Sequence, residues 1–400
     1  MKINKIPGPK ANALDKKMRK LNGAYAAPYP AFLTQEGQGA FVTDVDGNNL
    51  LDFTSQIATN PLGYNHPKMI EVMNKFSGRA PVKYAGQDFM LEKHIEMLEE
   101  VMSITPKQFN SAFLINSGAE AVENAIKICH KKKTGIGVGF EGAFHGRTLG
   151  ALTYTNSKRI QSAGFPEFPS NKLPFNDSAG EKLEKMIKND TDFSFVIIEP
   201  VQGEGGYNPS SQKMMKDIRK ITKKNNIFMI CDEIQSGVGR TGKWWAFEHF
   251  GITPDVITSG KGLQVGATIA NKKMFPESGA ISSTWGGGSL IDLSMGIAVI
   301  QTIKREKMLK RNERLGKYIM RQLIELNEDN LIESPRGMGL MIGFDLKDKK
   351  TRDSLIQKCF KQGLMILGAG EKTVRLAPPY VINEYDADLA LRIISRNLMH

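Results

Sequence analysis

Hydrophobic and polar positions follow two different patterns along the chain. Residues from about 40 to 53 alternate apolar and polar side chains around an Asp-Gly pair, which predicts a β-hairpin. Further on, short and nearly continuous apolar runs are each followed by a turn and a helical stretch. These runs cover residues 111–116, 134–140, 194–200, 226–233 and 254–260. Because strands that are buried on both faces have this pattern, the runs predict a mostly parallel sheet covered by helices.

The last hundred residues have a different pattern. A long helical pattern covers about 290–327, and the strand-like segments RGMGLMIGFDL and TVRLAPPY flank an amphipathic helix at about 351–363. We therefore predict an α/β protein with a large domain over residues 61–300. Residues 301–400 form a smaller α+β domain, and residues 1–60, with the hairpin, are predicted to be part of it.

Polar residues gather where the predicted strands end. Glu199, Asp232 and Lys261 each close an apolar run, and the last two are separated by one helix and one strand. Because ligands bind at the carboxyl edge of such sheets, we expect these ends to share a crevice. A carboxylate beside a hydrophobic sheet needs a cation partner. A lysine buried there has a lowered pKa and is a nucleophilic amine.

A third element is the turn Asn116-Ser117-Gly118-Ala119-Glu120, which opens the helix AEAVENAIKICHK. Such a turn offers free N–H groups and a hydroxyl to a phosphate. Together with Lys261 and Asp232 it predicts a site for pyridoxal phosphate (PLP), in which the lysine forms a Schiff base and the carboxylate keeps the pyridine nitrogen protonated. Each feature alone also fits a plainer role: an ordinary N-cap, a surface lysine, or an aspartate paired with a structural arginine.

Charge and glycine spacing bear on two other kinds of ligand, nucleic acids and dinucleotides. The chain carries 54 Lys and Arg against 42 Asp and Glu, a net charge of +12, and half of this excess lies in the first twenty residues. A second basic stretch, Thr302 to Lys317, has helical apolar spacing. Neither stretch interleaves aromatic residues as a nucleic-acid module usually does, so we expect no nucleic-acid partner. Gly137, Gly139 and Gly142 fit G-x-G-x-x-G, but the helix and acidic residue of a dinucleotide site do not follow.

The remaining composition concerns location. Only three cysteines are present, which predicts a reducing compartment rather than a disulfide scaffold. No apolar run approaches the ~20 residues of a membrane-spanning helix. The N-terminus MKINKIPGPK lacks the apolar core of a signal peptide. We therefore predict a cytoplasmic protein without a membrane partner, and we expect no metal site.

Six segments resemble one family. NSGAEAVENAIK, FEGAFHGRTLGALTYT, VIIEPVQGEGGY, CDEIQSGVGRTGKWWAFEHFGITPDVITSGKG, STWGGG and VRLAPP occur in order over about residues 110–380. In this order they resemble the class III (ω-amino acid) aminotransferases. The resemblance implies PLP fold type I, with a mostly parallel seven-stranded-type sheet in the large domain and a smaller α+β domain.

Four further segments narrow the resemblance. KGLQVGATIA, ISSTWGGGSLIDL, ESPRGMGLMIGFDL and LMILGAGEKTVRLAPP are most similar to L-lysine 6-aminotransferases. The family commonly has Gly-Gly-Gly-x-Pro after the lysine and Gly-Gly-Asn-Pro after the threonine. This chain has GLQVGA and GGGSL there, which departs from the 4-aminobutyrate and acetylornithine enzymes.

The resemblance implies a role for each matched residue at the cofactor. Lys261 forms the Schiff base and then moves the proton, Asp232 pairs with the pyridinium nitrogen, and Gln235 contacts the ring hydroxyl. Phe144 stacks on the ring, and Thr284 reaches the phosphate across the interface of a homodimer with a shared active site. The phosphate is otherwise held by Ser117, Gly118 and Ala119.

Three further residues concern substrate choice. Arg147 and Arg375 are implied to clamp carboxylates, which arginine binds bidentately. Glu204 is the implied switch: paired with Arg375 it masks that arginine in the first half-reaction, and once it swings away Arg375 takes the α-carboxylate of 2-oxoglutarate. A fixed structural Arg–Glu pair is the alternative. His145 fits either a packed histidine or a functional one.

The implied reaction is ping-pong transfer of a terminal amino group to 2-oxoglutarate, which gives glutamate and a semialdehyde. L-Lysine at its ε-amine is the expected donor. The alternatives are 4-aminobutyrate, ornithine or acetylornithine. A racemase or aminomutase on the same scaffold would use Lys261 and Asp232 without a keto-acid acceptor. An inactive relative is disfavoured because the lysine, aspartate and phosphate segments are all present.

Overall fold

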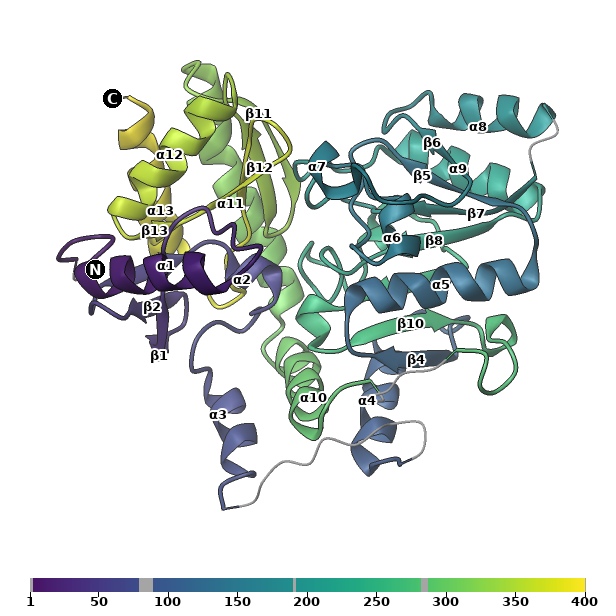
Figure 1. Ribbon diagram of the computed structural model, residues 1–400, viewed down its shortest axis with the longest axis horizontal. Helices are drawn as coiled ribbons and strands as arrows, with labels where there is room; N and C mark the ends of the chain where they lie inside the picture. Colours follow the sequence, from purple (N-terminus) through teal and green to yellow (C-terminus); the bar gives the residue numbers. More distant parts are fainter. Residues whose placement is uncertain (1–2, 79–88, 190–191, 282–286, 400) are drawn as a thin grey trace. The chain divides into compact units, whose positions relative to one another are not determined.

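The computed structural model describes residues 3–78, 89–189, 192–281 and 287–399. The chain divides into two compact units, one formed by Met1–Ile70 with Arg311–His400 and the other by Glu71–Lys310 (Figure 1). The domain limits predicted at residues 60 and 300 stay predictions. We call the first the smaller unit and the second the larger unit.

The larger unit is built on a seven-stranded sheet in the order β4-β10-β9-β8-β7-β5-β6. The strands are β4 (Ser111–Ile115), β5 (Ile136–Phe140), β6 (Ser170–Leu173), β7 (Phe193–Ile198), β8 (Phe228–Asp232), β9 (Val256–Ser259) and β10 (Gly266–Ala270). Only β10 runs antiparallel to its neighbours. The predicted mostly parallel sheet and its five apolar strands are confirmed. β6 and β10 were not predicted, because their sequences SNKL and GATIA are short and carry few large apolar residues.

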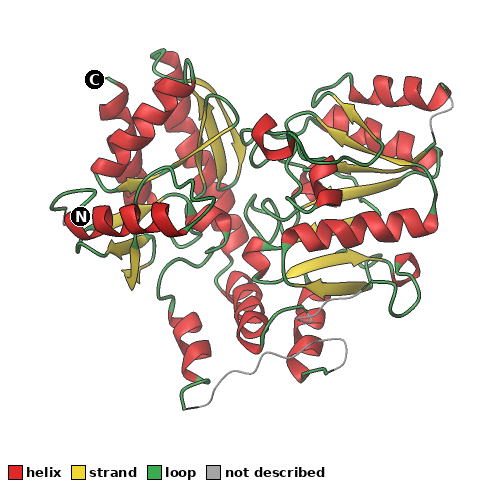
Figure 2. Cartoon of the chain, in the orientation of Figure 1, coloured by secondary structure: helices red, strands yellow, loops and turns green. Residues whose placement is uncertain are grey.

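Helices precede, connect and follow these strands (Figure 2). They are α3 (Pro67–Asn74), α4 (Glu92–Ser103), α5 (Gly118–Lys132), α6 (Leu149–Thr153), α7 (Arg159–Ser162), α8 (Ala179–Lys188), α9 (Gln212–Lys224) and α10 (Leu290–Arg305), with three 3-10 helices, η1 (Ala246–Phe250), η2 (Lys261–Leu263) and η3 (Lys272–Met274). Over the ranges that the structure describes, no helix has the length and apolar character needed to cross a membrane.

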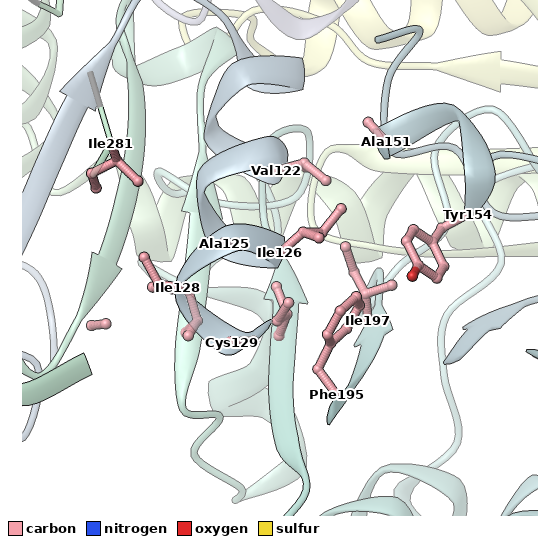
Figure 3. Close-up of a cluster of buried hydrophobic side chains, with 13 residues drawn as sticks. Val122, Ala125, Ile126, Ile128, Cys129, Ala151, Tyr154, Phe195, Ile197 and Ile281 are labelled. Carbon is pink, nitrogen blue, oxygen red and sulfur yellow. The ribbon is translucent and has the colours of Figure 1, made fainter. Parts of the chain in front are cut away.

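The core of the larger unit lies between α5 and the sheet (Figure 3). Val122, Ile126 and Cys129 recur at helical spacing and form an apolar stripe on α5, which packs against Phe195 and Ile197 of β7. The packing fixes the start of α5 beside the carboxyl ends of the strands, where the predicted site lies.

Tyr154 explains the glycines of the dinucleotide-like motif. A Cβ atom added at Gly137 would overlap the Tyr154 hydroxyl, and one at Gly139 would lie 3.3 Å from the Tyr154 ring. The ring also meets Phe195 edge-on, with centroids 5.3 Å apart. Gly137 and Gly139 therefore lie in β5 to make room for a buried aromatic ring.

The smaller unit contains two four-stranded sheets, ordered β1-β2-β3-β13 and β11-β12-β15-β14. Their strands are β1 (Leu33–Gln38), β2 (Phe41–Asp44), β3 (Asn49–Asp52), β11 (Glu333–Met338), β12 (Met341–Asp345), β13 (Leu364–Met365), β14 (Leu367–Ala369) and β15 (Thr373–Leu376). The helices are α1 (Pro9–Leu21), α2 (Ser55–Ala58), α11 (Met308–Glu328), α12 (Lys349–Lys361) and α13 (Glu384–Leu398). β2 and β3 pair antiparallel, which confirms the predicted hairpin.

The single helix predicted over 290–327 is wrong. The segment forms α10 and α11, with a break at Lys307, whose φ is 53°. The basic stretch predicted as one helix from Thr302 to Lys317 spans this break. Neither glycine nor proline marks the position, so the apolar spacing gave no signal of it.

The turn α2 has an unusual backbone. Four consecutive residues, Ser55–Ala58, have positive φ, and none of them is glycine. Left-handed geometry costs an L-residue ~1–2 kcal/mol. Asp52 offsets this cost, because its Oδ1 accepts from the Thr54 amide at 2.7 Å and the Ser55 amide at 3.1 Å. The Ser55 hydroxyl also donates to the Ala377 carbonyl at 2.6 Å.

Candidate active site

A cavity of about 330 Å³ lies in the larger unit, where β7, β8 and β9 end. It brings together most residues that the sequence predicts for the site: Gly118, Ala119, Phe144, Arg147, Glu204, Asp232, Gln235 and Lys261. Its lining also includes residues without a predicted role, namely His145, Gly146, Glu199, Val201, Ile234 and Ser236. The strand-end pattern therefore located the cavity correctly.

Asp232 is fixed at the end of β8. Its Oδ1 accepts hydrogen bonds from the Thr258 hydroxyl at 3.0 Å and from the Ile234 amide at 3.1 Å. Its Oδ2 lies 2.7 Å from His145 Nδ1. Both side chains are almost completely buried. Three contacts thus hold the carboxyl group in one orientation at the wall of the cavity.

His145 takes the place of the cation expected beside Asp232. Its backbone amide donates to the Thr155 hydroxyl at 2.9 Å, and its Nδ1 meets Asp232. Its Nε2 is buried without a hydrogen-bond partner in the described protein. The ring is therefore buried and in contact with the predicted cofactor carboxylate, and a functional role for His145 stays a prediction.

Lys261 begins η2 immediately after β9. Its φ is 37°, a left-handed backbone in a residue that has a Cβ. Strain of this kind persists where the surrounding structure imposes it, and it is concentrated at functional sites. Here the Gln264 amide and side chain both donate to the Lys261 carbonyl at 3.0 Å and close the tight turn. The strained turn holds the lysine where it lines the cavity.

The start of α5 supplies the predicted phosphate site. Ser117 is the N-cap: its hydroxyl accepts from the Glu120 amide at 3.2 Å and donates to the Glu120 carboxylate at 2.8 Å. Gly118 and Ala119, the first helical residues, line the cavity. A Cβ added at Gly118 would lie 2.9 Å from Ile234 Cδ1. Glycine therefore lets the positive end of α5 approach the turn after β8 closely, where it favours an anion.

Phe144 and Arg147 follow β5 in one loop. The Arg147 guanidinium carbon lies 5.9 Å from the centre of the Phe144 ring, within the range of a cation–π contact. Arg147 is exposed and Phe144 is half-buried. A cation available to a carboxylate therefore lies directly beside the aromatic face that is predicted to stack on the cofactor.

Glu204 has a cation partner that the sequence did not indicate. Lys158 Nζ lies 3.5 Å from Glu204 Oε2, with the side chains 40% and 15% exposed. Lys158 precedes α7, far from Glu204 along the chain. The predicted switch residue therefore already lies next to a positive charge within the larger unit.

Glu199 is the functional candidate that the sequence analysis left without a role. It follows β7, is 6% exposed, and accepts hydrogen bonds from the amides of Phe144 at 2.9 Å and Gly203 at 2.8 Å. Burial raises its pKa to about 7, and the nearby Asp232 charge adds to the shift, whereas His145 and the two amides oppose it. The only available signal was its place at a strand end.

Two predicted residues that the structure describes, Ser117 and Arg375, are not in the lining of this cavity. Arg375 is on β15 of the smaller unit, between Gly343 of β12 and Leu367 of β14, and is 5% exposed. Thr284 falls outside the described residues. Their predicted roles stay predictions. In the part of the chain that the structure describes, no cluster of His, Cys, Asp and Glu could hold a metal ion.

The cavity has the features that PLP requires. Two residues that line it each have a buried polar atom without a protein partner in the described residues, Gln235 Oε1 and His145 Nε2. Gly203 packs so tightly on Gln235 that a Cβ there would lie 2.8 Å from Gln235 Nε2. A lysine, a fixed carboxylate, an aromatic face and a helix N-terminus line one cavity, and these suit an amine-linked, protonated, phosphorylated ring.

Known proteins agree with this chemistry. The sequence model of the family "Aminotransferase class-III" matches residues 24–398. The chain is 35% identical to the acetylornithine aminotransferase of Archaeoglobus fulgidus, over 90% of this chain and 94% of that protein. It is 29% identical to the mitochondrial 4-aminobutyrate aminotransferase of Sus scrofa, over 98% of this chain and 89% of that protein.

Solved structures give the same result. The lysine aminotransferase of M. tuberculosis superposes with a TM-score of 0.89 at 25% identity, covering 97% of this chain and 99% of that chain. The family's enzymes use PLP, so PLP is the cofactor for which this cavity is built. The predicted α/β fold of PLP type I is confirmed. Because the family match covers almost the whole chain, this protein belongs to the class III aminotransferases.

Proposed function

We propose that this protein transfers a terminal amino group from an amino acid donor to 2-oxoglutarate, with L-lysine as the preferred donor at its ε-amine. The observation that carries the proposal is the single cavity in which Lys261 and Asp232 lie together with Arg147. It offers a nucleophilic amine, a buried carboxylate and a carboxylate-binding cation to one small molecule. The products would be glutamate and a semialdehyde.

Each of these side chains has a separate task. PLP, when bound, supplies the electron sink that allows a C–H bond at the amine-bearing carbon to break. Asp232, held by His145 and Thr258, keeps a proton on the ring nitrogen. Lys261 Nζ would take the proton from the amine-bearing carbon and pass it to the cofactor, not back to the same carbon, so that the amino group stays with the cofactor and the donor leaves as an aldehyde. Arg147 binds a substrate carboxylate beside Phe144, and Glu204 is the switch residue in the same cavity.

Two donors have specific support. The segments after Lys261 and around residues 281–293 resemble lysine aminotransferases, and the M. tuberculosis lysine aminotransferase is a structural neighbour. N-Acetylornithine is the second candidate, because curated relatives 32–35% identical to this chain are named acetylornithine aminotransferases. The two donors differ at the end remote from the reacting amine.

A donor panel tests the proposal. Lysine, N-acetylornithine, ornithine and 4-aminobutyrate are each supplied with 2-oxoglutarate, and glutamate is measured. We expect kcat/KM to be highest for lysine, with glutamate equimolar to the 2-oxoglutarate consumed. A higher value for N-acetylornithine or 4-aminobutyrate would overturn the lysine preference. Donor conversion without loss of 2-oxoglutarate would instead indicate a racemase or aminomutase.

The substitution Lys261→Ala tests the chemistry itself. It should abolish turnover and the pH-dependent visible absorbance of the PLP-loaded protein, because no amine remains to carry the cofactor or the proton. Lys272→Ala, at the exposed start of η3, is the matched control and should keep both. Full turnover in the Lys261 variant would contradict the assignment.

We propose further that the enzyme is a cytoplasmic homodimer. Cys129, Cys231 and Cys359 are free and buried, which suits a reducing compartment. Thr284 is predicted to contribute to the partner's phosphate site. Light scattering of the loaded enzyme measures its mass, and a monomer of about 44.3 kDa with full activity would contradict the shared site.

A further inference from the structure

One carboxyl group joins the two loops that carry the predicted cofactor and substrate contacts. Glu199 Oε1 accepts from the Phe144 amide at 2.9 Å, and Glu199 Oε2 accepts from the Gly203 amide at 2.8 Å. Phe144 belongs to the loop after β5, and Gly203 directly precedes Glu204 in the loop after β7. The two oxygens of one side chain therefore hold one backbone amide of each loop.

The same two loops also pack backbone against backbone. A Cβ added at Gly205 would overlap the carbonyl oxygen of Gly142. The Gln202 side-chain amide donates to the Glu141 carbonyl at 2.7 Å. A displacement of one loop is thus transmitted to the other, and Glu199 is the contact that lies at the cavity itself.

The influence of Glu199 extends to Asp232 through two consecutive residues. The amide that Glu199 holds belongs to Phe144, and the next residue, His145, contacts Asp232 at 2.7 Å. His145 is also held by the Thr155 hydroxyl. Glu199, Phe144, His145 and Asp232 therefore form a continuous series of contacts from the substrate side of the cavity to the predicted nitrogen-binding carboxylate.

We propose that Glu199 is a positioning residue of this enzyme, which sets the ring-stacking face of Phe144 and the position of Glu204 together. The inference rests on the proposed function and deepens it. Glu199 takes no part in bond breaking. It makes cofactor contact and carboxylate recognition depend on the same side chain, so the two cannot be altered independently.

The isosteric substitution Glu199→Gln isolates this role. A glutamine oxygen accepts only one of the two amide hydrogens, and its NH₂ group then faces the other N–H, donor against donor. The loop whose amide faces the NH₂ group must move away, although the glutamine side chain has the same shape as glutamate. Glu199→Asp keeps the charge but is one methylene shorter, so it cannot reach both amides. Gln202→Met is the matched control, since it removes a different bond between the same loops.

Two measurements on each variant test the proposal. The first is the affinity of the apoenzyme for PLP by absorbance titration at pH 8, where Glu199, with its pKa raised to about 7, is ionised. The second is the ratio of KM for 2-oxoglutarate to KM for the amino donor. We expect Glu199→Gln and Glu199→Asp to weaken PLP binding by roughly tenfold, as the loss of a hydrogen bond to a charged group implies, and to change the KM ratio at least about threefold. Gln202→Met should leave both within about twofold.

Three results would overturn the proposal. In the first, Glu199→Gln changes neither quantity. In the second, only one quantity changes, so that Glu199 serves a single loop. In the third, Gln202→Met reproduces both effects, so that general loosening explains them. Failure of the wild-type enzyme to form glutamate would instead reject the proposed function, and the PLP titration would still report on Glu199.

Discussion

Two carboxylates follow neighbouring parallel strands, and the structure gives them opposite surroundings. Asp232 ends β8 and is bound by a histidine ring, a hydroxyl and one amide, whereas Glu199 follows β7 and accepts from two backbone amides. Both are at least nine-tenths buried. The sequence pattern, a carboxylate that closes an apolar run, is the same in both.

Both carboxylates lie at strand ends, so their position does not distinguish them. Their hydrogen-bond partners do, and these partners indicate which role each carboxylate can have. A carboxylate held by a histidine ring, a hydroxyl and an amide has a fixed orientation in the wall of the cavity. A carboxylate that accepts from two amides is suited to holding loops. Because burial alone favours the protonated form, Glu199 has a pKa raised to about 7.

We expect the largest effect on activity from a substitution of Asp232. Asp232→Asn removes the charge that we propose keeps the ring nitrogen protonated, and it keeps the shape of the side chain. We expect kcat to fall by roughly 10²–10³-fold, as for other losses of a fixed electrostatic contact at a reacting centre. Steady-state kinetics with saturating PLP measure the fall. Glu233→Gln, at the next residue and also buried, should cost far less. Equal losses in the two variants would mean that burial, not the cofactor contact, explains the effect.

The second test removes the ring that distinguishes Asp232 from Glu199. His145→Phe keeps an aromatic ring but leaves Asp232 Oδ2 without its 2.7 Å partner. An unpaired buried acceptor costs about 1–3 kcal/mol, so we expect kcat to fall by roughly tenfold. The pH dependence of cofactor absorbance should change with it. His130→Phe, on the far end of α5, is the control. A His145 variant with unchanged absorbance and rate would reduce His145 to packing.

The site was largely predictable because parallel strands place their carboxyl ends at one edge. Asp232, Lys261 and the start of α5 met in one cavity for this reason. The role of Glu199 was not predictable, because backbone amides carry no residue-type signal. The contact of Lys158 with Glu204 was hidden for a similar reason: the two are distant in sequence and only the fold brings them together.

The fold shows the same division. Apolar runs and helical spacing identified five strands of the main sheet and the hairpin, since both patterns follow from which faces are buried. Backbone conformations that tertiary contacts impose have no pattern in the sequence from which they could be predicted. Ser55–Ala58 adopt positive φ without glycine because Asp52 accepts from the neighbouring amides, and Lys307 interrupts α10 and α11 without glycine or proline.

The raised pKa of Glu199 should also make the stability of the folded protein depend on pH. Burial raises the pKa of Glu199 from 4.5 to about 7, so the folded protein keeps this proton up to neutral pH whereas the unfolded chain releases it near 4.5. Stability therefore falls as pH rises from 4.5 towards 7 and falls no further from this group above that. In Glu199→Gln this contribution is absent. The difference in unfolding free energy between pH 5 and pH 8, measured with urea, should shrink by roughly 2–3 kcal/mol. Identical pH slopes in the two proteins would contradict the raised pKa.

The smallest effect is expected at the edge of the cavity, where Lys158 lies 3.5 Å from Glu204. Lys158 is 40% exposed, so the pair contributes at most about 1 kcal/mol and rates should change no more than about fivefold. The informative result is which of the two KM values rises more. Lys158→Met removes a positive charge 3.5 Å from the Glu204 carboxylate and so makes this part of the cavity more negative. KM for the dianion 2-oxoglutarate should therefore rise more than KM for the cationic donor lysine.

Salt and a matched variant separate this effect from a loss of packing. The rise in KM for 2-oxoglutarate should fade as ionic strength increases, because screening weakens a charge effect and leaves a packing effect in place. Lys185→Met, on the exposed surface of α8, changes the net charge equally and should leave both KM values unchanged. If Lys158→Met raises the two KM values equally at every salt concentration, Lys158 supports the loop rather than the charge balance of Glu204. Neighbouring groups would then determine the roles of Asp232 and Glu199 but not that of Glu204. The partners of these two carboxylates are buried more deeply than Lys158.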